Sequence, residues 1–427
     1  MVFVGIDWAE AHHDACLLDE QGGVIDQLRI ADSMEGVNQL QAVLARHADQ
    51  PGEIVIGIEL SHGLLVQALR AAGYTIYAIN PMAASRYRDR HAVSKAKSDR
   101  GDAKMLADLV RTDRHNHRPL LEDSDQAEAV KVLARSQKSL IWQRQQVVNQ
   151  LRSALREFYP GALEAFADDL AAPSALALLV LAPTPARGRT LSLSKIETVL
   201  RRAGRRREVT ERARATQAAL RKPQLEQPTP ISEAMGAQVA SLARIAAAVN
   251  TEIANLTSEL AAGFEVHPDA EIYLSLPGLG VVLGARVLGE FGDDPNRFAD
   301  GKARRNYAGT SPLTRASGTK KVVMARLVGN DRLADACQGW AFAALQGSPG
   351  ARRYYEVQRA RGKAHRKRCG RWPIDWWASS MDACATASCT AKLEHGLMAK
   401  KWPRDSRRRG RHHELFRGTS VRFSSST

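Results

Sequence analysis

The sequence predicts an α/β ribonuclease-H-like domain at the N-terminus, followed by a long helical arm and a mainly α-helical C-terminal domain. Three observations support this fold class. Three short apolar segments and then two helix–strand units fill residues 2–79. Two long stretches in the middle of the chain carry apolar residues at helical spacing. Helical patterns resume after residue 266, around a Gly-rich turn and a Ser-Gly loop.

Composition points to a nucleic-acid partner. The 427 residues include 61 Lys and Arg against 46 Asp and Glu, a formal net charge of +15. A hydrophobic fraction of 44% and a charged fraction of 25% exclude wholesale disorder and a collagen-like fibre. The excess of cations favours polyanions, because Lys and Arg displace counterions from phosphates. No apolar run reaches the roughly 18 residues of a membrane span, and five cysteines show no disulfide framework, so a soluble protein of a reducing compartment is expected.

The N-terminal domain is expected over residues 1–120. Apolar segments predict strands and amphipathic segments predict helices. The expected strands are residues 2–6, 15–18, 24–30, 54–58 and 74–79, with helices at 34–44 and 64–69. This order is typical of the ribonuclease-H-like fold, which actin-like ATPases share, so the fold alone does not decide the function. The bulky, acidic Trp8-Ala9-Glu10 disfavours the phosphate loop of a kinase.

Four acidic residues are the candidate metal ligands of this domain. Asp7 and Glu59 fall at the C-terminal ends of expected strands, where open α/β sheets place their sites. Asp99 and Asp102 open an expected helix at i, i+3 spacing and so share one face. Four converging acids without matched cations suit Mg²⁺, and two such ions can hold both oxygens of a phosphodiester displacement. Taken singly, each acid also fits a helix cap or strand-end turn.

Three other acids of the domain are expected to be solvated rather than to bind metal. They are Glu10, Asp14 and Asp108.

A helical arm is expected over residues 121–265, with a basic insertion at 160–228. Its second helix shows a heptad seam, which favours an antiparallel coiled coil over an ordinary bundle core. The seam residues are Met235, Val239, Leu242, Ala246, Val249, Ile253, Leu256 and Leu260. The insertion contains the run Arg201-Arg202-Ala203-Gly204-Arg205-Arg206-Arg207, which suits either a solvated face or a phosphate contact.

The C-terminal domain, expected over residues 266–365, contains a turn of helix-hairpin-helix form. In Leu276-Pro277-Gly278-Leu279-Gly280 the glycines would let backbone N–H groups approach a DNA phosphate. Gly278 and Gly280 are therefore candidate nucleic-acid contacts. The alternative is a helix–helix turn in which Gly allows tight packing.

A second candidate site is the Ser317-Gly318 loop, expected between helical segments. Ser317 lies between Arg315 and the pair Lys320-Lys321, and these cations could hold a phosphate. A serine hydroxyl is a weak nucleophile until a base removes its proton. From the residues alone, an anion-binding turn is the more common reading of such a loop.

These pieces together resemble the D-E-D-D transposases of bacterial insertion sequences, the IS110 group. The resemblance covers about residues 1–365 and rests on several motifs. They are Gly5-Ile6-Asp7, Glu59, Lys97-Ser98-Asp99 with Asp102-Ala103, Leu276-Pro277-Gly278-Leu279-Gly280, Tyr307-Ala308-Gly309 with Pro312, Ser317-Gly318, Tyr354-Tyr355 and Arg359-Ala360-Arg361-Gly362-Lys363.

The resemblance implies a RuvC-like domain in which Asp7, Glu59, Asp99 and Asp102 bind Mg²⁺, or Mn²⁺ in its place. It also implies a transposase domain whose nucleophile matches Ser317, forming a phosphoserine bond to DNA that a DNA hydroxyl then resolves. Ser311 is the nearest alternative for that role. It precedes Pro312, in a part of the family motif where a hydroxyl is incidental.

The partners implied are DNA, a structured non-coding guide RNA and further copies of the chain in a dimer or tetramer, in the bacterial cytoplasm at the nucleoid. Two alternatives stay open. One is a metal-dependent junction nuclease without a covalent intermediate, and the other is an inactive basic nucleic-acid-binding protein.

The tail, residues 366–427, departs from the family. It holds Trp372, Trp376, Trp377 and Trp402, four of the seven tryptophans, without an apolar period. Back-translation of residues 371–382 allows a shifted frame reading V-A-N-R-L-V-G and then I-L-H-G, which suits the family's final helix. We hypothesise a frameshift near codon 366, and an alternative frame full of stop codons in the gene would refute it. Zinc binding by the tail cysteines is disfavoured, because they form no C-x-x-C pair.

Overall fold

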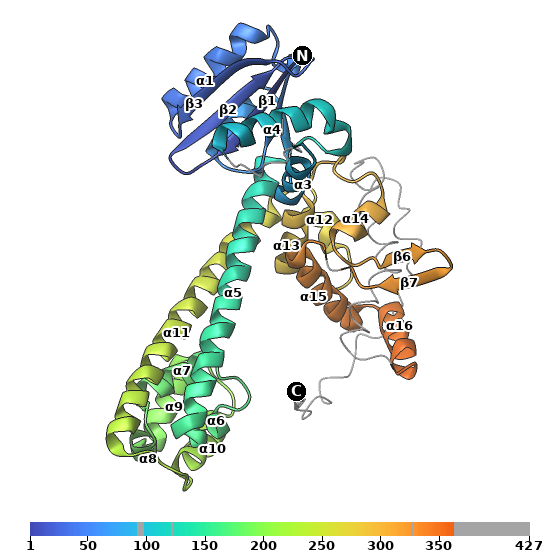
Figure 1. Cartoon of the computed structure of the whole chain (residues 1–427). Helices are drawn as coiled ribbons and strands as arrows, with labels where there is room; N and C mark the ends of the chain where they lie inside the picture. Colours follow the sequence, from blue (N-terminus) through green and yellow to red (C-terminus); the bar gives the residue numbers. More distant parts are fainter. Residues whose placement is uncertain (92–97, 121–122, 327, 363–427) are drawn as a thin grey trace. The chain divides into compact units, whose positions relative to one another are not determined.

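The computed structural model describes residues 1–91, 98–120, 123–326 and 328–362 (Figure 1). The chain divides into two compact units, Met1–Glu122 and Asp123–Thr427. The second unit holds both the arm and the C-terminal helices. None of the helices described is long and apolar enough to cross a bilayer. The tail with its proposed frameshift lies outside the described residues.

The first unit is a mixed α/β domain built on one five-stranded sheet, as predicted. The sheet order is β3-β2-β1-β4-β5, with β1 antiparallel to β2 and parallel to β4, which is consistent with a ribonuclease-H-like fold. Its strands are β1 (Val2–Trp8), β2 (His12–Leu18), β3 (Val24–Ala31), β4 (Ile54–Ile58) and β5 (Thr75–Ala78). Its helices are α1 (Met34–His47), α2 (Leu64–Ala71), α3 (Pro81–His91) and α4 (Asp99–Thr112).

Two apolar cores cover the two faces of this sheet. Val4 and Ile6 point to the face that α1 and α2 cover, through residues such as Leu40 and Leu69. Phe3 points to the opposite face, beneath α3 and α4. This alternation follows from the two-residue period of a strand. The sequence analysis did not predict α3, because that helix is rich in charge and Ala84 is its contribution to the buried core.

The second unit is organised around two long antiparallel helices, α5 (Asp125–Phe158) and α11 (Thr229–Glu265) (Figure 1). The Gln137 side chain donates to Thr257 Oγ1 at 2.6 Å, and Arg144 donates to Asn250 at 3.0 Å, which sets the antiparallel direction. All eight predicted seam residues of α11 are buried or half-buried. The predicted long helical pair is therefore confirmed.

Each end of this pair carries its own core. One core joins the C-terminal half of α5 and the N-terminal half of α11 to the helices of the insertion. These are α6 (Pro160–Ala165), α7 (Pro173–Leu181), α8 (Pro185–Thr190), α9 (Leu193–Arg202) and α10 (Val209–Arg221). The insertion, expected only as a Pro- and Arg-rich stretch, is thus a folded helical cap. The arm is a bundle at this end and a two-helix pair in its middle.

The other core gathers the C-terminal elements around the opposite ends of α5 and α11. These elements are α12 (Ala270–Leu274), α13 (Val281–Phe291), α14 (Gly301–Tyr307), α15 (Asp331–Gly347) and α16 (Pro349–Ala360). Between α14 and α15, the strands β6 (Leu313–Ser317) and β7 (Lys320–Met324) contribute no residue to this core. Trp340 is completely buried in this core, and its indole N–H donates to the Pro277 carbonyl at 2.8 Å. That bond ties α15 to the Gly-rich turn.

Candidate active site

Asp7 and Glu59 each follow directly after the last paired residues of two parallel strands. Ile6 is opposite Ile58 in the β1–β4 ladder, and Gly5 is opposite Gly57. Because side chains two residues apart share a face, Asp7 lies on the face of Gly5, and Glu59, which follows β4, continues the face of Gly57. The sheet register therefore brings these two acids to neighbouring positions.

That face is the one covered by α4. A Cβ atom on Gly5 would lie 1.9 Å from the Ala103 carbonyl oxygen. Farther back along β1, Phe3 packs beneath Arg114, whose guanidinium carbon is 5.0 Å from the ring centre. Helix α4 therefore runs antiparallel to β1. Its first turn reaches the end of the strand that bears Asp7.

The first turn of α4 carries the other two predicted ligands. Ser98 caps the helix, because its hydroxyl accepts from Gly101 N at 3.1 Å. Asp102 is buried and Asp99 is exposed. Strand register and helix packing thus put Asp7, Glu59 and the Asp99–Asp102 turn toward one edge of the sheet. Within the described residues, however, the one group of three possible ligand atoms within 4.8 Å of one another contains only Asp99 of these four acids.

Cations accompany two of these acids. Arg88 of α3 forms an ion pair with Asp102 at 2.7 Å, and Arg29 of β3 lies 3.4 Å from Asp99. The expectation that the acids lack matched cations is therefore wrong for Asp99 and Asp102. A divalent ion would have to compete with these guanidinium groups, or shift them, to use both carboxylates.

Asp14 belongs to the same edge and was missed. It lies directly opposite Asp7 in the β1–β2 ladder and is 2% exposed, so the expectation that it is solvated is wrong. Arg29, opposite Asp14 on β3, donates Nη2 to its carboxylate at 2.7 Å and Nε at 3.1 Å. The sequence analysis began this strand at Ala15, whereas β2 begins at His12. The earlier start would have aligned Asp14 with Asp7.

A small group of possible ligands includes this acid. The ligand atoms of His12, Asp14 and Asp99 lie within 4.8 Å of one another. Carboxylate oxygens are the donors that hard divalent cations prefer, so the donor set at this edge suits such an ion. Arg29 contacts both acids of the group, and its positive charge opposes a cation placed between them.

Ser317 lies at the tip of a β-hairpin rather than in a loop between helices. It ends β6, pairs with Lys320 of β7, and is followed by Gly318 with φ +55°. Two-residue hairpin loops favour positive φ at this position, which explains the glycine. The hairpin was missed because its strands, LTRAS and KKVVM, have no buried face: every residue except the half-buried Leu313 is exposed.

The hairpin register separates the predicted phosphate contacts. Arg315, Ser317 and Lys320 share one face, because Ser317 pairs with Lys320 and Arg315 lies two residues earlier. Lys321 pairs with Ala316 and lies on the opposite face. The structure thus places two of the three cations beside the Ser317 hydroxyl.

Ser311 has structural partners of its own. Its hydroxyl donates to the Asn306 side-chain oxygen and accepts from Arg326 Nε at 3.3 Å. Arg326 also donates to Asn306 at 3.1 Å. These bonds tie the entry of the hairpin to its exit, which gives Ser311 a role that does not require nucleophilic chemistry.

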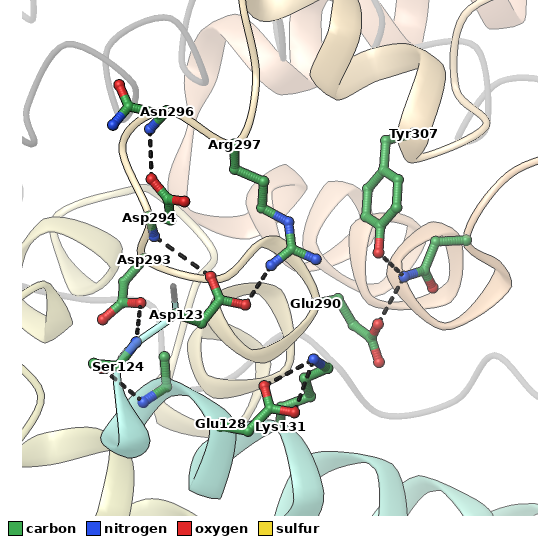
Figure 2. A network of polar contacts seen from close by, with 12 residues as sticks. Asp123, Ser124, Glu128, Lys131, Glu290, Asp293, Asp294, Asn296, Arg297 and Tyr307 are labelled. Atoms are coloured by element: carbon green, nitrogen blue, oxygen red, sulfur yellow. Dashed lines mark hydrogen bonds and ion pairs between the residues drawn. The ribbon is translucent and has the colours of Figure 1, made fainter. Parts of the chain in front are cut away.

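The base of the hairpin is anchored on a buried carboxylate (Figure 2). Glu290 of α13 accepts from both Nε and Nη2 of Arg135 at 2.8 Å. It also accepts Asn330 Nδ2 at 2.7 Å, and the same nitrogen donates to the Tyr307 hydroxyl at 3.0 Å. Burial opposes ionisation of Glu290, but the hydrogen bonds from Arg135 and Asn330 bring its pKa below the ordinary value. Glu290 therefore anchors Asn330 at the exit of the segment that carries Ser317, and Asn330 in turn bonds Tyr307 at its entry.

The two glycines of the Gly-rich turn have different surroundings. Gly278 packs closely on a helix, and Gly280 has no close neighbour among the described residues. Gly278 has φ +86°, and a Cβ there would lie 2.4 Å from the backbone nitrogen of Ala344. Close packing on α15 therefore accounts for Gly278. Gly280 is exposed with nothing near its Cβ position, and it precedes α13. The predicted DNA contacts by the backbone N–H groups of Gly278 and Gly280 stay predictions, with Gly280 the more exposed of the two.

The comparisons with known proteins give the class. Residues 4–160 match a family model described as "Transposase", and residues 270–356 match one described as "Transposase IS116/IS110/IS902 family". The first match spans the acidic edge and the second spans the serine hairpin. The chain is therefore a transposase, an enzyme that cuts and rejoins DNA.

Its relatives identify the family. The chain is 47% identical over 368 residues to a Streptomyces coelicolor protein whose name makes it the candidate transposase of the IS117 mini-circle, covering 85% of this chain and 89% of that protein. It is 31% identical to a 43.6 kDa protein of insertion element IS110 from Streptomyces coelicolor, covering 85% and 89%. It is also 30% identical to a 42 kDa protein of IS900 from Mycobacterium paratuberculosis, covering 85% and 90%. The chain belongs to the IS110 family of transposases.

Proposed function

We propose that this transposase exchanges DNA strands through a covalent serine–DNA intermediate, with Ser317 as the nucleophile. The Ser317 hydroxyl gives up its proton and its oxygen bonds to a DNA phosphorus, while the bond from that phosphorus to a DNA oxygen breaks and the oxygen takes a proton to become a hydroxyl. A second DNA hydroxyl then loses its proton and attacks the phosphoserine, and the bond to the serine oxygen breaks as that oxygen regains a proton. Arg315 and Lys320 hold the phosphate, because they lie on the Ser317 face of the hairpin.

The acidic edge is proposed to hold Mg²⁺, with Mn²⁺ as a substitute. Asp7, Glu59, Asp99 and Asp102 would be its ligands, and a bound divalent ion would neutralise charge on the reacting phosphate. The observation that supports this best is the register of β1 and β4, in which Ile6 is opposite Ile58, so that Asp7 and Glu59 follow at neighbouring strand ends on the side that α4 covers. Asp14 and Arg29 would complete the edge by orienting Asp99.

Recognition of the target is proposed to involve a structured non-coding RNA and several copies of the chain. The net charge of +15 supports polyanion binding by the whole protein. We also propose that the protein acts at the bacterial nucleoid as a dimer or tetramer.

Trapping of a protein–DNA adduct tests the serine step. We expect denaturing gels of the wild type with DNA and Mg²⁺ to show a covalent adduct, and S317A to lose it while still binding DNA. S311A is the matched control, because it removes a nearby hydroxyl, and it should keep the adduct. An adduct in S317A would place the nucleophile elsewhere.

The same gels distinguish the alternatives. DNA cleavage without any adduct in the wild type would favour a metal-dependent junction nuclease. Metal-independent binding with no cleavage would favour an inactive nucleic-acid-binding protein. Asp7→Asn and Glu59→Gln should each abolish cleavage, and calorimetry should show that they also weaken Mn²⁺ binding.

A further inference from the structure

The connection between α9 and α10 forms an exposed cluster of cations, here named the arginine turn. It comprises Arg202, Arg205, Arg206 and Arg207, and all four are exposed. The turn belongs to the helical cap, which packs on the N-terminal half of α11, and the core next to the serine hairpin is at the other end of that helix (Figure 1). Within the cap the turn lies toward the middle of the arm, because nearby Arg212 pairs with Asp168 and Ala171 accepts from Asn250 of α11. The arginine turn is thus remote from Ser317 within the same unit.

The backbone of the turn is well defined. Gly204 has φ +88°, Arg205 N donates to the Leu200 carbonyl at 3.0 Å, and Gly204 N donates to Arg201 at 3.0 Å. This pair of bonds is a Schellman motif, which ends a helix with a glycine in a left-handed conformation. The motif reverses the chain within a few residues and so concentrates the arginines at one corner of the cap.

Five cations around the cap form ion pairs with acids, whereas the arginines of the turn do not form any described ion pair. Around the cap, Arg187 pairs with Glu233, Arg189 with Glu226, Arg201 with Glu197, Arg212 with Asp168 and Lys222 with Glu164. Within the described residues, Arg202, Arg206 and Arg207 have no acidic partner, and Arg205 donates to the Arg207 carbonyl at 3.2 Å. In the described part of the chain Lys195, Arg214 and Arg221 of the cap also lack an acidic partner, but they are spread along α9 and α10, whereas the arginine turn gathers four arginines within six residues.

We infer that the arginine turn is a docking surface for the phosphate backbone of double-stranded DNA. A cluster of guanidinium groups attracts closely spaced phosphates and repels a copy of itself, which disfavours contact between two such turns. DNA is the polyanion on which a transposase acts. The inference does not depend on the serine chemistry, because it concerns binding alone.

The length of the arm places this contact far from the reacting phosphate. Helix α11 has 37 residues. The cap residues nearest the turn contact α11 at Asn250, which is 15 residues before the end of the helix at Glu265. At about 1.5 Å per residue this is roughly 22 Å along the arm, the length of about 6 to 7 base pairs at ~3.4 Å each. The arginine turn therefore holds a flank of the DNA substrate rather than the exchange point.

Salt-dependent binding tests the inference. The test variant is R205Q/R206Q/R207Q. The control is R152Q/R156Q/R244Q, which removes three exposed arginines from the helices α5 and α11. Affinity for a long duplex is measured in EDTA, so that no strand is cut. We expect the turn variant to bind about tenfold to hundredfold more weakly than the control near 0.15 M salt, with a salt slope smaller by about 2 to 3. All six positions are exposed, and circular dichroism verifies that both variants fold.

Two results would overturn the inference. One is equal binding and an equal salt slope for the turn variant and the control. The other is a loss confined to a structured RNA, with duplex binding unchanged, which would assign the turn to RNA. Shortening the duplex is a further check. Because the contact is with a flank, a short duplex should erase the difference between the two variants, and a difference that persists on it would count against a remote site.

Discussion

Gly5 and Gly57 lie opposite each other on the parallel strands β1 and β4, and both face the backbone of α4. A Cβ on Gly5 would lie 1.9 Å from the Ala103 oxygen, and one on Gly57 would lie 2.8 Å from the Leu106 oxygen. The two glycines let α4 sit directly on the sheet. This contact fixes how close the first turn of α4 lies to the sheet. It therefore also fixes the distance of Asp99 and Asp102 from the end of β1, where Asp7 lies.

Gly5→Ala should displace α4 and destabilise the first unit. Overpacking of a tight core costs about 1–3 kcal/mol, and the clash here is with backbone, which cannot rotate away. Urea unfolding measures the change. Gly52→Ala is the matched control, because a Cβ there meets nothing within 4 Å. Equal stability of the two variants would contradict the close approach.

Arg29→Gln should lower the melting temperature, because Asp14 is then left buried without its cation. The double variant D14N/R29Q should recover most of the loss, since an amide pair replaces the ion pair. Thermal melts of the single and double variants, with D14N alone, complete the cycle. If Mg²⁺ instead restores the stability of R29Q, Asp14 is a metal ligand and not an anchor for Arg29.

Glu290→Gln should destabilise the second unit by about 1–3 kcal/mol at neutral pH, because the buried bonds to Arg135 and Asn330 lose their charge assistance. The folded-state pKa of Glu290 is below its ordinary value of 4.5. Its stabilisation is therefore present above that value and is lost as the pH falls through the folded-state pKa. Urea unfolding at a series of pH values should show the wild type and E290Q converging in acid. The exposed Glu271→Gln serves as the control, and a gap that stays constant with pH would contradict this account.

Tyr159→Phe should leave stability unchanged or raise it by up to about 1 kcal/mol. The Tyr159 hydroxyl is buried and has no hydrogen-bond partner among the described residues, and burial raises its pKa. Tyr307→Phe is the contrasting variant. It loses the bond from Asn330, and a loss of about 1 kcal/mol is expected. Chemical unfolding compares the two, and a larger loss in Y159F would show that its hydroxyl is satisfied.

Elements with a strong local pattern were predictable. The strands with buried faces, such as Ile54–Ile58, and the heptad seam of α11 follow from apolar periodicity alone. Elements without a buried stripe were not. Helix α3 and the exposed hairpin β6–β7 owe their positions to neighbouring segments, so their own residues carry little signal.

The residues of the candidate site also fall into those that local sequence patterns predict and those that they do not. Asp7, Glu59, Asp99 and Asp102 could be proposed from strand ends and helix spacing. Asp14, Arg29 and Arg88 could not, because each joins the edge through a pairing register or a helix packing that links distant parts of the chain.

By itself, the sequence determined the order of helices and strands, the basic charge and the family, because these depend on residue type and local spacing. Tertiary structure decided which charges meet. It set Asp14 opposite Asp7 and anchored the Ser317 hairpin on Glu290. It also left the arginine turn without acidic partners in the described residues, because strand register and helix packing act between residues far apart in the chain.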